Sequence, residues 1–246
     1  MIASEPNPFR ASHGSNAMRP AAVVFDNDGL LLDTEPCWTR AQQAVFSRRG
    51  RVFDLDAKRA IVGTAPETAA AVLERLLEEP GRGRELSDEM YALALEEIVN
   101  GATPRPHALE LVREVRDAFP VAVASNAPRT HLLAGLRRTG LDDVFEVSLG
   151  VDDVEHPKPS PDLYLRVCEL LGVSPSQAVA LEDSPPGVAS ARAAGLFVIG
   201  VPSVAGVELA ADVVAPSLGD PRVRAALALD EPPGRERGSR ARGRRS

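Results

Sequence analysis

Short apolar runs bounded by turn residues recur along the chain between residues 21 and 215. Because these runs are continuous rather than alternating, they predict strands that are buried on both faces. Five runs have this pattern and a sixth, the last, has it more weakly: 21–25, 121–124, 144–149, 178–181, 197–201 and 212–215. The pattern predicts a sheet in the interior of the protein.

Segments with helical spacing alternate with these runs. Just before the second run, apolar residues recur every three or four positions: Ala108, Leu111, Val112, Val115 and Phe119. Further helices are predicted at 128–139, 160–171 and 185–194. Strands alternating with helices indicate a parallel sheet with helices on both faces. The expected fold class is therefore α/β, with a Rossmann-like parallel sheet as its core.

One interval breaks the alternation. About 95 residues separate Asp26 from Val121, whereas a simple crossover between parallel strands needs little more than a dozen. Helical spacing predicts helices within it at 36–49, 66–79 and 86–99. We expect an inserted α-helical cap domain at 36–104, with the core formed by 19–35 and 105–230. Such an insertion would cover the carboxyl ends of the strands, where open α/β sheets bind ligands.

The two ends of the chain differ from the part between them. Residues 1–18 have no periodicity and residues 231–246 are rich in Pro, Gly and Arg, so both are predicted to be disordered tails. The second tail is basic, and without it the chain carries 22 basic and 33 acidic residues. An acidic body argues against a nucleic-acid-binding surface. The basic tail is either an RNA or membrane tether or, as we favour, a disordered end.

The overall composition is ordinary for a globular protein, with 44 % hydrophobic and 26 % charged residues. No apolar run approaches the ~18 residues of a membrane span, and mean hydropathy is -0.10. Residues 1–20 lack a secretory signal pattern. Cys37 and Cys168 have no disulfide or metal-ligand spacing. We expect a cytoplasmic protein without membrane association, monomeric or weakly dimeric.

Two acids follow the first predicted strand, in the sequence Phe-Asp-Asn-Asp-Gly. Asp26 and Asp28 would point the same way from an extended chain. Like charges this close require a cation or a shared proton. A simple turn is the alternative, since Asp, Asn and Gly all favour turns.

Polar residues also follow two more predicted strands, and a lysine lies in a loop. Ser125 is followed by Asn126. Taken alone, Ser125 is typical of a helix N-cap, although a helix N-terminus also binds phosphate. Glu182 and Asp183 end the strand at 178–181 and again fit helix capping. Lys158, one of only two lysines in the chain, lies in a proline-rich loop. Acids at several strand ends on one sheet edge make independent capping a poor explanation, and hard oxygen ligands suit Mg²⁺.

These residues form four ordered motifs, and with them the chain resembles the haloacid dehalogenase-like (HAD-like) hydrolase superfamily. The resemblance covers about residues 20–218 and extends to its phosphatase and β-phosphoglucomutase branch, which has a helical cap. Asn27 departs from it, because an apolar residue is usual there. The motifs are Asp26-x-Asp28-Gly29-x-Leu31 with Asp33-Thr34-Glu35, Ser125-Asn126, Lys158-Pro159-x-Pro161-Asp162, and Glu182-Asp183-Ser184-x-x-Gly187.

The resemblance implies a Mg²⁺-dependent phosphatase acting on a small phosphorylated metabolite. By similarity, Asp26 attacks phosphorus to form an aspartyl-phosphate, and Asp28 acts as general acid and base. Ser125 and the Asn126 amide would hold the phosphoryl oxygens, with Lys158 offsetting their charge. The metal would be held by the remaining acids together with the nucleophile: Asp26, the Asp28 carbonyl oxygen, Asp183 and, nearby or as an outer ligand, Glu182.

Three rival functions remain at this point. A phosphorelay receiver has similar residues, but its phosphoacceptor follows a later strand and it lacks a cap. A catalytically silent binding protein is disfavoured by the full set of carboxylates. A β-phosphoglucomutase shares every core motif, but such mutases carry a His where Trp38 stands and an Arg where Pro66 stands. Sugar phosphates, phosphoglycolate and nucleotide monophosphates all stay open as substrates.

Overall fold

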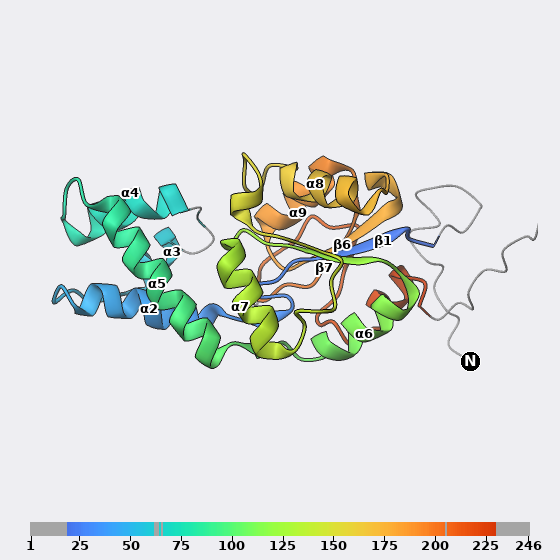
Figure 1. Ribbon diagram of the computed structural model, residues 1–246, viewed down its shortest axis with the longest axis horizontal. Coiled ribbons are helices and arrows are strands. Elements are labelled where there is room, and N and C mark those ends of the chain that lie inside the picture. The colour runs from blue at the N-terminus through green and yellow to red at the C-terminus, as the bar shows by residue number, and fades with distance from the viewer. Residues whose placement is uncertain (1–18, 62–63, 65, 205, 230–246) are drawn as a thin grey trace, which may run out of the picture.

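Six parallel strands form the central sheet, in the order β5-β4-β1-β6-β7-β8 (Figure 1). The computed structural model describes residues 19–61, 64, 66–204 and 206–229. The expected α/β class is confirmed, and the weak sixth strand is present. The strands are β1 (Ala22–Phe25), β4 (Val121–Ala124), β5 (Val147–Leu149), β6 (Ala178–Glu182), β7 (Phe197–Gly200) and β8 (Val213–Val214).

Helices cover both faces of this sheet (Figure 1). On one face, Val23 and Phe25 pack with residues of α6 (Ala108–Ala118), α7 (Arg129–Thr139) and α10 (Pro221–Ala226). On the other face, Val24 packs with residues of α8 (Asp162–Leu171) and α9 (Pro185–Ala194). Successive residues of a strand point to opposite faces, so a continuous apolar run supplies both halves of the core.

The long interval after β1 contains four helices, which together form the helical insertion. They are α2 (Glu35–Ser47), α3 (Leu55–Ile61), α4 (Pro66–Leu77) and α5 (Gly83–Gly101). They enclose a separate apolar cluster that includes Val45, Phe46, Leu73, Leu86 and Met90. The chain enters and leaves through two short antiparallel strands, β2 (Leu32–Asp33) and β3 (Thr103–Pro104).

Aromatic rings join the insertion to the sheet-bearing part of the protein. The Trp38 ring of α2 stacks on the His131 ring of α7, with centroids 5.5 Å apart. His131 Nε2 lies 2.8 Å from the Tyr91 carbonyl oxygen of α5. Because that oxygen can only accept, Nε2 carries the proton. The insertion is thus held on α7 by packing and by a directional bond.

Several details differ from the sequence prediction. The helix expected at 86–99 begins earlier, at Gly83. A Cβ at this position would lie 2.7 Å from the Ala70 carbonyl oxygen, so glycine allows α4 to lie close to the start of α5. The strand expected from 144 begins at Val147, the first residue paired with β4. The short helices α3 and α10 were not predicted. They have seven and six residues, too few for a clear periodic pattern.

Two further expectations concern the ends of the chain and membrane-spanning helices. The predicted disordered tails, 1–18 and 231–246, lie outside the described residues. Within the described part, no helix is long and apolar enough to cross a membrane.

Candidate active site

The carboxyl ends of β1 and β6 bring three acids and one lysine together. Asp26 follows β1 directly, Glu182 is the last residue of β6, and Asp183 comes next. One carboxylate oxygen from each of these three lies within 4.8 Å of the others. Lys158 Nζ lies 2.6 Å from Asp26 Oδ1 and 2.6 Å from Glu182 Oε1. These four sequence-predicted site residues therefore form one buried cluster.

All the N–H donors of the Lys158 ammonium group make hydrogen bonds within the protein. An ammonium group has three N–H donors. Two reach the acids named above, and the third donates to the Ala124 carbonyl oxygen at the end of β4, at 2.8 Å. Burial lowers the pKa of Lys158, but Asp26 and Glu182 raise it by more, so the net shift is upward. The lysine is therefore a permanent cation at this position.

The acids outnumber the lysine, and their pKa values reflect it. Burial and then the charge of Glu182 raise the pKa of Asp26 well above its usual value, although Lys158 opposes the shift. Burial and Glu182 likewise raise the pKa of Asp183 to about 7. Three carboxylates facing one ammonium leave an excess of negative charge in a buried place. That excess favours a further cation.

The donor set fits Mg²⁺. Three carboxylates within reach of one point supply the hard oxygen ligands that this ion prefers, and a set this small leaves positions for water and phosphate. The Asp28 carboxylate is outside this group. Its expected contribution was through its backbone carbonyl oxygen, so the place of its side chain does not bear on that expectation.

Asp28 is held between the sheet edge and the helical insertion. Its Oδ1 accepts from Thr34 Oγ1 at 2.5 Å, and its Oδ2 accepts from Ser125 Oγ at 2.9 Å. Thr34 is the residue immediately before α2. The carboxylate thus touches both the expected phosphate-binding serine and the entrance to the insertion.

Ser125 and Asn126 lie in a tight turn after β4. Ser125 Oγ accepts from the Ala127 N–H at 2.9 Å. The reading of Ser125 as a helix N-cap is wrong, because α7 begins only at Arg129 with Pro128 at its N-cap. Glu182 and Asp183 do not cap α9 either, since Ser184 does so by accepting from the Gly187 N–H. The polar residues at these strand ends are therefore available to the site.

The Asn126 side chain fixes the loop that carries Lys158. Its Oδ1 accepts from the Lys158 N–H at 2.9 Å, and its Nδ2 donates to the Lys158 carbonyl oxygen at 3.1 Å. These two bonds hold the backbone N–H and the backbone carbonyl of the same residue, and so fix the point from which the lysine side chain starts. The sequence motif pointed to the Asn126 amide as a phosphate contact and gave no sign of this role for its side chain.

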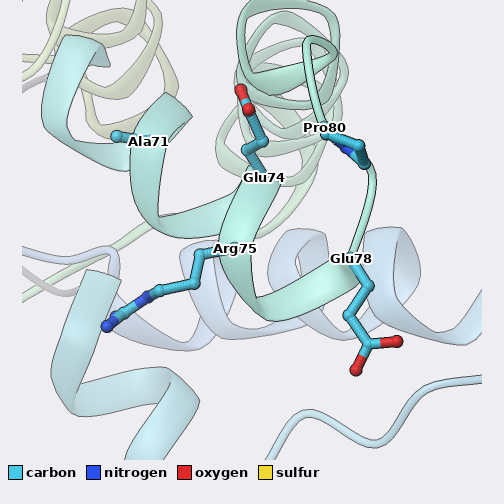
Figure 2. Close-up of a pocket in the computed structure, with 5 residues that line it drawn as sticks. All are labelled: Ala71, Glu74, Arg75, Glu78 and Pro80. Carbon is cyan, nitrogen blue, oxygen red and sulfur yellow. The ribbon is translucent and has the colours of Figure 1, made fainter.

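A hollow elsewhere in the protein lacks such convergence. It has a volume of about 410 Å³ and lies on the insertion near the end of α4, lined by Ala71, Glu74, Arg75, Glu78 and Pro80. In Figure 2 the Arg75 and Glu78 side chains point away from each other. The Glu74 carboxylate is occupied by the Gly81 and Gly83 N–H groups. The hollow is a surface feature beside the α4–α5 loop, whereas the buried cluster of acids and lysine lies at the strand ends.

Three residues beside the cluster were not predicted from the sequence. Thr34 holds Asp28, as described. Tyr164 donates to Glu182 Oε1 at 2.6 Å, and a hydrogen bond from Ser203 lowers the pKa of Asp183, partly offsetting the effect of burial. Thr34 lies within one of the quoted motifs and Tyr164 lies just after another. This proximity was the only sign in the sequence that either residue belongs near the site. Ser203 had none.

The chain is similar to proteins of known family and to solved structures. A family model described as haloacid dehalogenase-like hydrolase matches residues 20–195. A phosphorylated carbohydrates phosphatase of Thermotoga maritima is 33 % identical over 71 % of this chain and 82 % of its own length. The fructose-1-phosphate phosphatase YqaB of Escherichia coli is 30 % identical over 74 % and 97 %. The crystal structure of CbbY from Rhodobacter sphaeroides with phosphate has a TM-score of 0.71 and 29 % identity, covering 81 % of this chain and 96 % of that one.

Proposed function

The chain belongs to the haloacid dehalogenase-like hydrolase family and to its phosphoric monoester hydrolases, and we propose that it is a Mg²⁺-dependent phosphatase for a small phosphorylated metabolite. One observation carries the proposal. The buried Asp26 carboxylate touches the Lys158 ammonium beside two further carboxylates, Glu182 and Asp183. An anionic nucleophile, a fixed cation and a metal-type donor set are what phosphoryl transfer requires.

Two acids perform the covalent chemistry in this proposal. A carboxylate oxygen of Asp26 forms a bond to phosphorus while the bond from phosphorus to the substrate alcohol breaks, and Asp28 gives that alcohol its proton. Asp28 then takes a proton from water, which attacks the aspartyl-phosphate and releases phosphate. The contacts of Asp28 with Thr34 and Ser125 keep its carboxylate at the same strand ends as Asp26.

The phosphoryl oxygens are held by the remaining residues. Lys158 offsets their charge, and Ser125 with the backbone amide of Asn126 supplies hydrogen bonds. Asp26, Glu182 and Asp183 would hold Mg²⁺, together with the Asp28 carbonyl oxygen. When bound, the ion supplies positive charge that allows a phosphate dianion to approach these carboxylates.

The substrate class is proposed from the relatives. Two of them are named for phosphorylated carbohydrates and fructose 1-phosphate, which favours a sugar phosphate here, with phosphoglycolate as another candidate. We further propose that the insertion, residues 36–104, is a cap domain that excludes water and selects the substrate. A cytoplasmic location, a monomer or weak dimer, and the lack of a nucleic-acid partner stay predictions.

A β-phosphoglucomutase is the alternative, and the insertion argues against it. The indole of Trp38, where these mutases carry a His, is packed against His131 and Tyr91. Pro66, where they carry an Arg, is the first residue of α4. Without that Arg, a second phosphate would be bound by a guanidinium fork only if another arginine, such as Arg59, supplied it. Otherwise water is expected to capture the aspartyl-phosphate.

The test is phosphate release from a panel of phosphate monoesters with Mg²⁺ or with EDTA. The panel contains fructose 1-phosphate, β-glucose 1-phosphate, phosphoglycolate and a nucleotide monophosphate. We expect turnover of a sugar phosphate in Mg²⁺ and none in EDTA. We also expect none with Asp26→Asn, which is isosteric and removes the nucleophile. Addition of β-glucose 1,6-bisphosphate with a glucose 6-phosphate readout tests the mutase.

Three results would contradict parts of the proposal. Turnover that persists in EDTA would remove the metal. A wild-type rate in Asp26→Asn would move the nucleophile to another residue. Isomerisation of β-glucose 1-phosphate faster than phosphate release would make the protein a mutase.

A further inference from the structure

Tyr164 reaches the site from the interior of the protein. It is in the first turn of α8, packs in the apolar cluster between α8, α9 and the sheet, and is fully buried. Its hydroxyl donates to Glu182 Oε1 at 2.6 Å. Because the residue has no exposed surface, it cannot touch a substrate. Any effect it has on the reaction passes through the groups that it contacts.

Those groups are the two that flank Asp26. Glu182 Oε1 accepts from Tyr164 and from Lys158 Nζ, both at 2.6 Å. Lys158 Nζ also lies 5.1 Å from the centroid of the Tyr164 ring. The phenol therefore contacts the acid through its hydroxyl and the ammonium through its ring face.

The Glu182 carboxylate is confined on its other sides as well. Its Oε2 accepts from the Asp183 N–H at 3.2 Å. A Cβ on Gly187 would lie 2.0 Å from its carboxyl carbon, so the backbone of α9 presses against the carboxylate. With Tyr164 on Oε1, the group has one orientation, in which Oε1 meets the lysine. Without the hydroxyl, Oε1 would keep only the lysine as a donor, and the orientation of the carboxylate would be less tightly fixed.

We propose, on the basis of the phosphatase function above, that Tyr164 is a positioning residue for this site. Its hydroxyl holds Glu182 Oε1, and Glu182 in turn aims the Lys158 ammonium at Asp26 Oδ1 and keeps its own Oε2 beside Asp183. A phenylalanine would fill the same space and present the same ring face. The hydroxyl is therefore the part that the proposal concerns.

The experiment compares Tyr164→Phe with Tyr91→Phe in the full chain. Tyr91 is the other tyrosine and belongs to the insertion. Loss of a group that orients a metal ligand typically costs about 10-fold to 100-fold in activity or metal affinity. We expect Tyr164→Phe to lower kcat, with KM nearly unchanged, and to weaken Mg²⁺ binding measured by calorimetry without substrate, each by an amount in this range. Tyr91→Phe should change neither.

A purely structural role predicts another result. Tyr164→Phe would then lower the melting temperature, while kcat and the Mg²⁺ dissociation constant, measured well below that temperature, would stay within about twofold of wild type. That outcome would overturn the proposal. If the wild-type protein turns over no substrate in the panel, the phosphatase function fails, and the calorimetry still decides whether Tyr164 orients the acidic cluster.

A second measurement applies if Tyr164→Phe does not fold. Biosynthetic incorporation of 3-fluorotyrosine into Tyr91→Phe leaves Tyr164 as the one fluorinated residue. We expect its fluorine resonance to shift when Mg²⁺ is added, and again when beryllofluoride is added. A resonance that stays at one frequency throughout would show that Tyr164 is not coupled to the site and would overturn the proposal.

Discussion

Acidic residues gather in two regions of the protein, the strand ends and the far end of the helical insertion, and they behave in opposite ways. At the strand ends, burial and mutual repulsion raise the pKa values of Asp26 and Asp183. On the insertion, hydrogen bonds from arginines lower the pKa values of Glu85 and Glu89. The first group has one ammonium group, that of Lys158, for three carboxylates, whereas each acid of the second group has an arginine within hydrogen-bond distance.

The difference separates the proposed functional cluster from a structural one. Arg49 bonds both Glu79 and Glu89, which ties α2 to the start of α5 and to the loop before it. These partly buried pairs match each carboxylate with a guanidinium, so they require no further ion. A buried set with an excess of carboxylates is costly unless something completes it. The location of unbalanced charge, more than the number of acids, identifies the site.

The largest effect is expected from removing the cation of the strand-end cluster. Lys158→Met leaves Asp26 and Glu182 buried without their partner, which typically costs about 3–5 kcal/mol of stability. Loss of a charge-stabilising donor typically costs about 10²–10³ in kcat. We expect both losses in urea unfolding and in phosphate release.

Lys58→Met is the matched control, because Lys58 is the other lysine of the chain. It pairs with Glu35 on the insertion, and both side chains are partly exposed. A pair of this kind contributes about 0–1 kcal/mol. Equal losses in the two variants would remove the distinction between the two regions.

The next effect concerns the backbone against Glu182. In Gly187→Ala the new Cβ would lie 2.0 Å from the Glu182 carboxyl carbon, and overpacking of this kind costs about 1–3 kcal/mol. In Gly101→Ala, at the end of α5, the new Cβ would lie 3.0 Å from the flexible end of Arg40 and at an ordinary contact distance of 3.8 Å from Cys37 Sγ. We expect Gly187→Ala to lose stability and activity, and Gly101→Ala to lose neither. A fully active Gly187→Ala would show that the Glu182 orientation is unimportant.

The sheet and most of the site residues could be predicted because each rests on a local pattern. A continuous apolar run followed by Asp26 or by Glu182 identifies a buried strand and the polar residue at its end. In a parallel sheet all such ends meet at one edge. That rule is enough to expect Asp26, Ser125 and Glu182 at the same edge, whereas Lys158, which lies in a loop, was expected there from the resemblance to the family.

Other contacts depend on three-dimensional packing that leaves no local trace. Tyr164 occupies an apolar position of an amphipathic helix, where the sequence gives no reason to expect a hydrogen bond to Glu182. The strands β2 and β3 have two residues each, too few to show alternation. The stacking of Trp38 on His131 joins residues 93 positions apart. Such contacts can be found only in the folded chain.

A smaller effect is expected from pH in the metal-free protein. The pKa of Asp183 rises from 3.8 to about 7 on folding, so between these values the folded state binds a proton that the unfolded state does not. The contribution of Asp183 to stability should therefore fall as pH rises from about 4 to about 7. Urea unfolding in EDTA at pH 5 and pH 8 measures this, and Asp183→Asn should reduce the difference, with the remainder coming from Asp26, whose pKa is also raised. Since Mg²⁺ replaces the proton, it should stabilise the protein more at pH 8. Equal stabilisation at both pH values would contradict this.

The smallest effect is expected where the two regions meet, at His131. Burial lowers its pKa from 6.5, and its hydrogen bond to the Tyr91 carbonyl only partly opposes the shift. Below pH 6.5 the unfolded chain therefore gains a proton that the folded protein resists, so this contact loses stability as pH falls and is complete above pH 6.5. His131→Gln keeps an N–H donor and does not titrate. Urea unfolding in saturating Mg²⁺ should show wild type losing more stability than His131→Gln between pH 7.5 and pH 5.5. Parallel pH curves would mean that protonation of His131 leaves the attachment of the insertion to α7 unchanged.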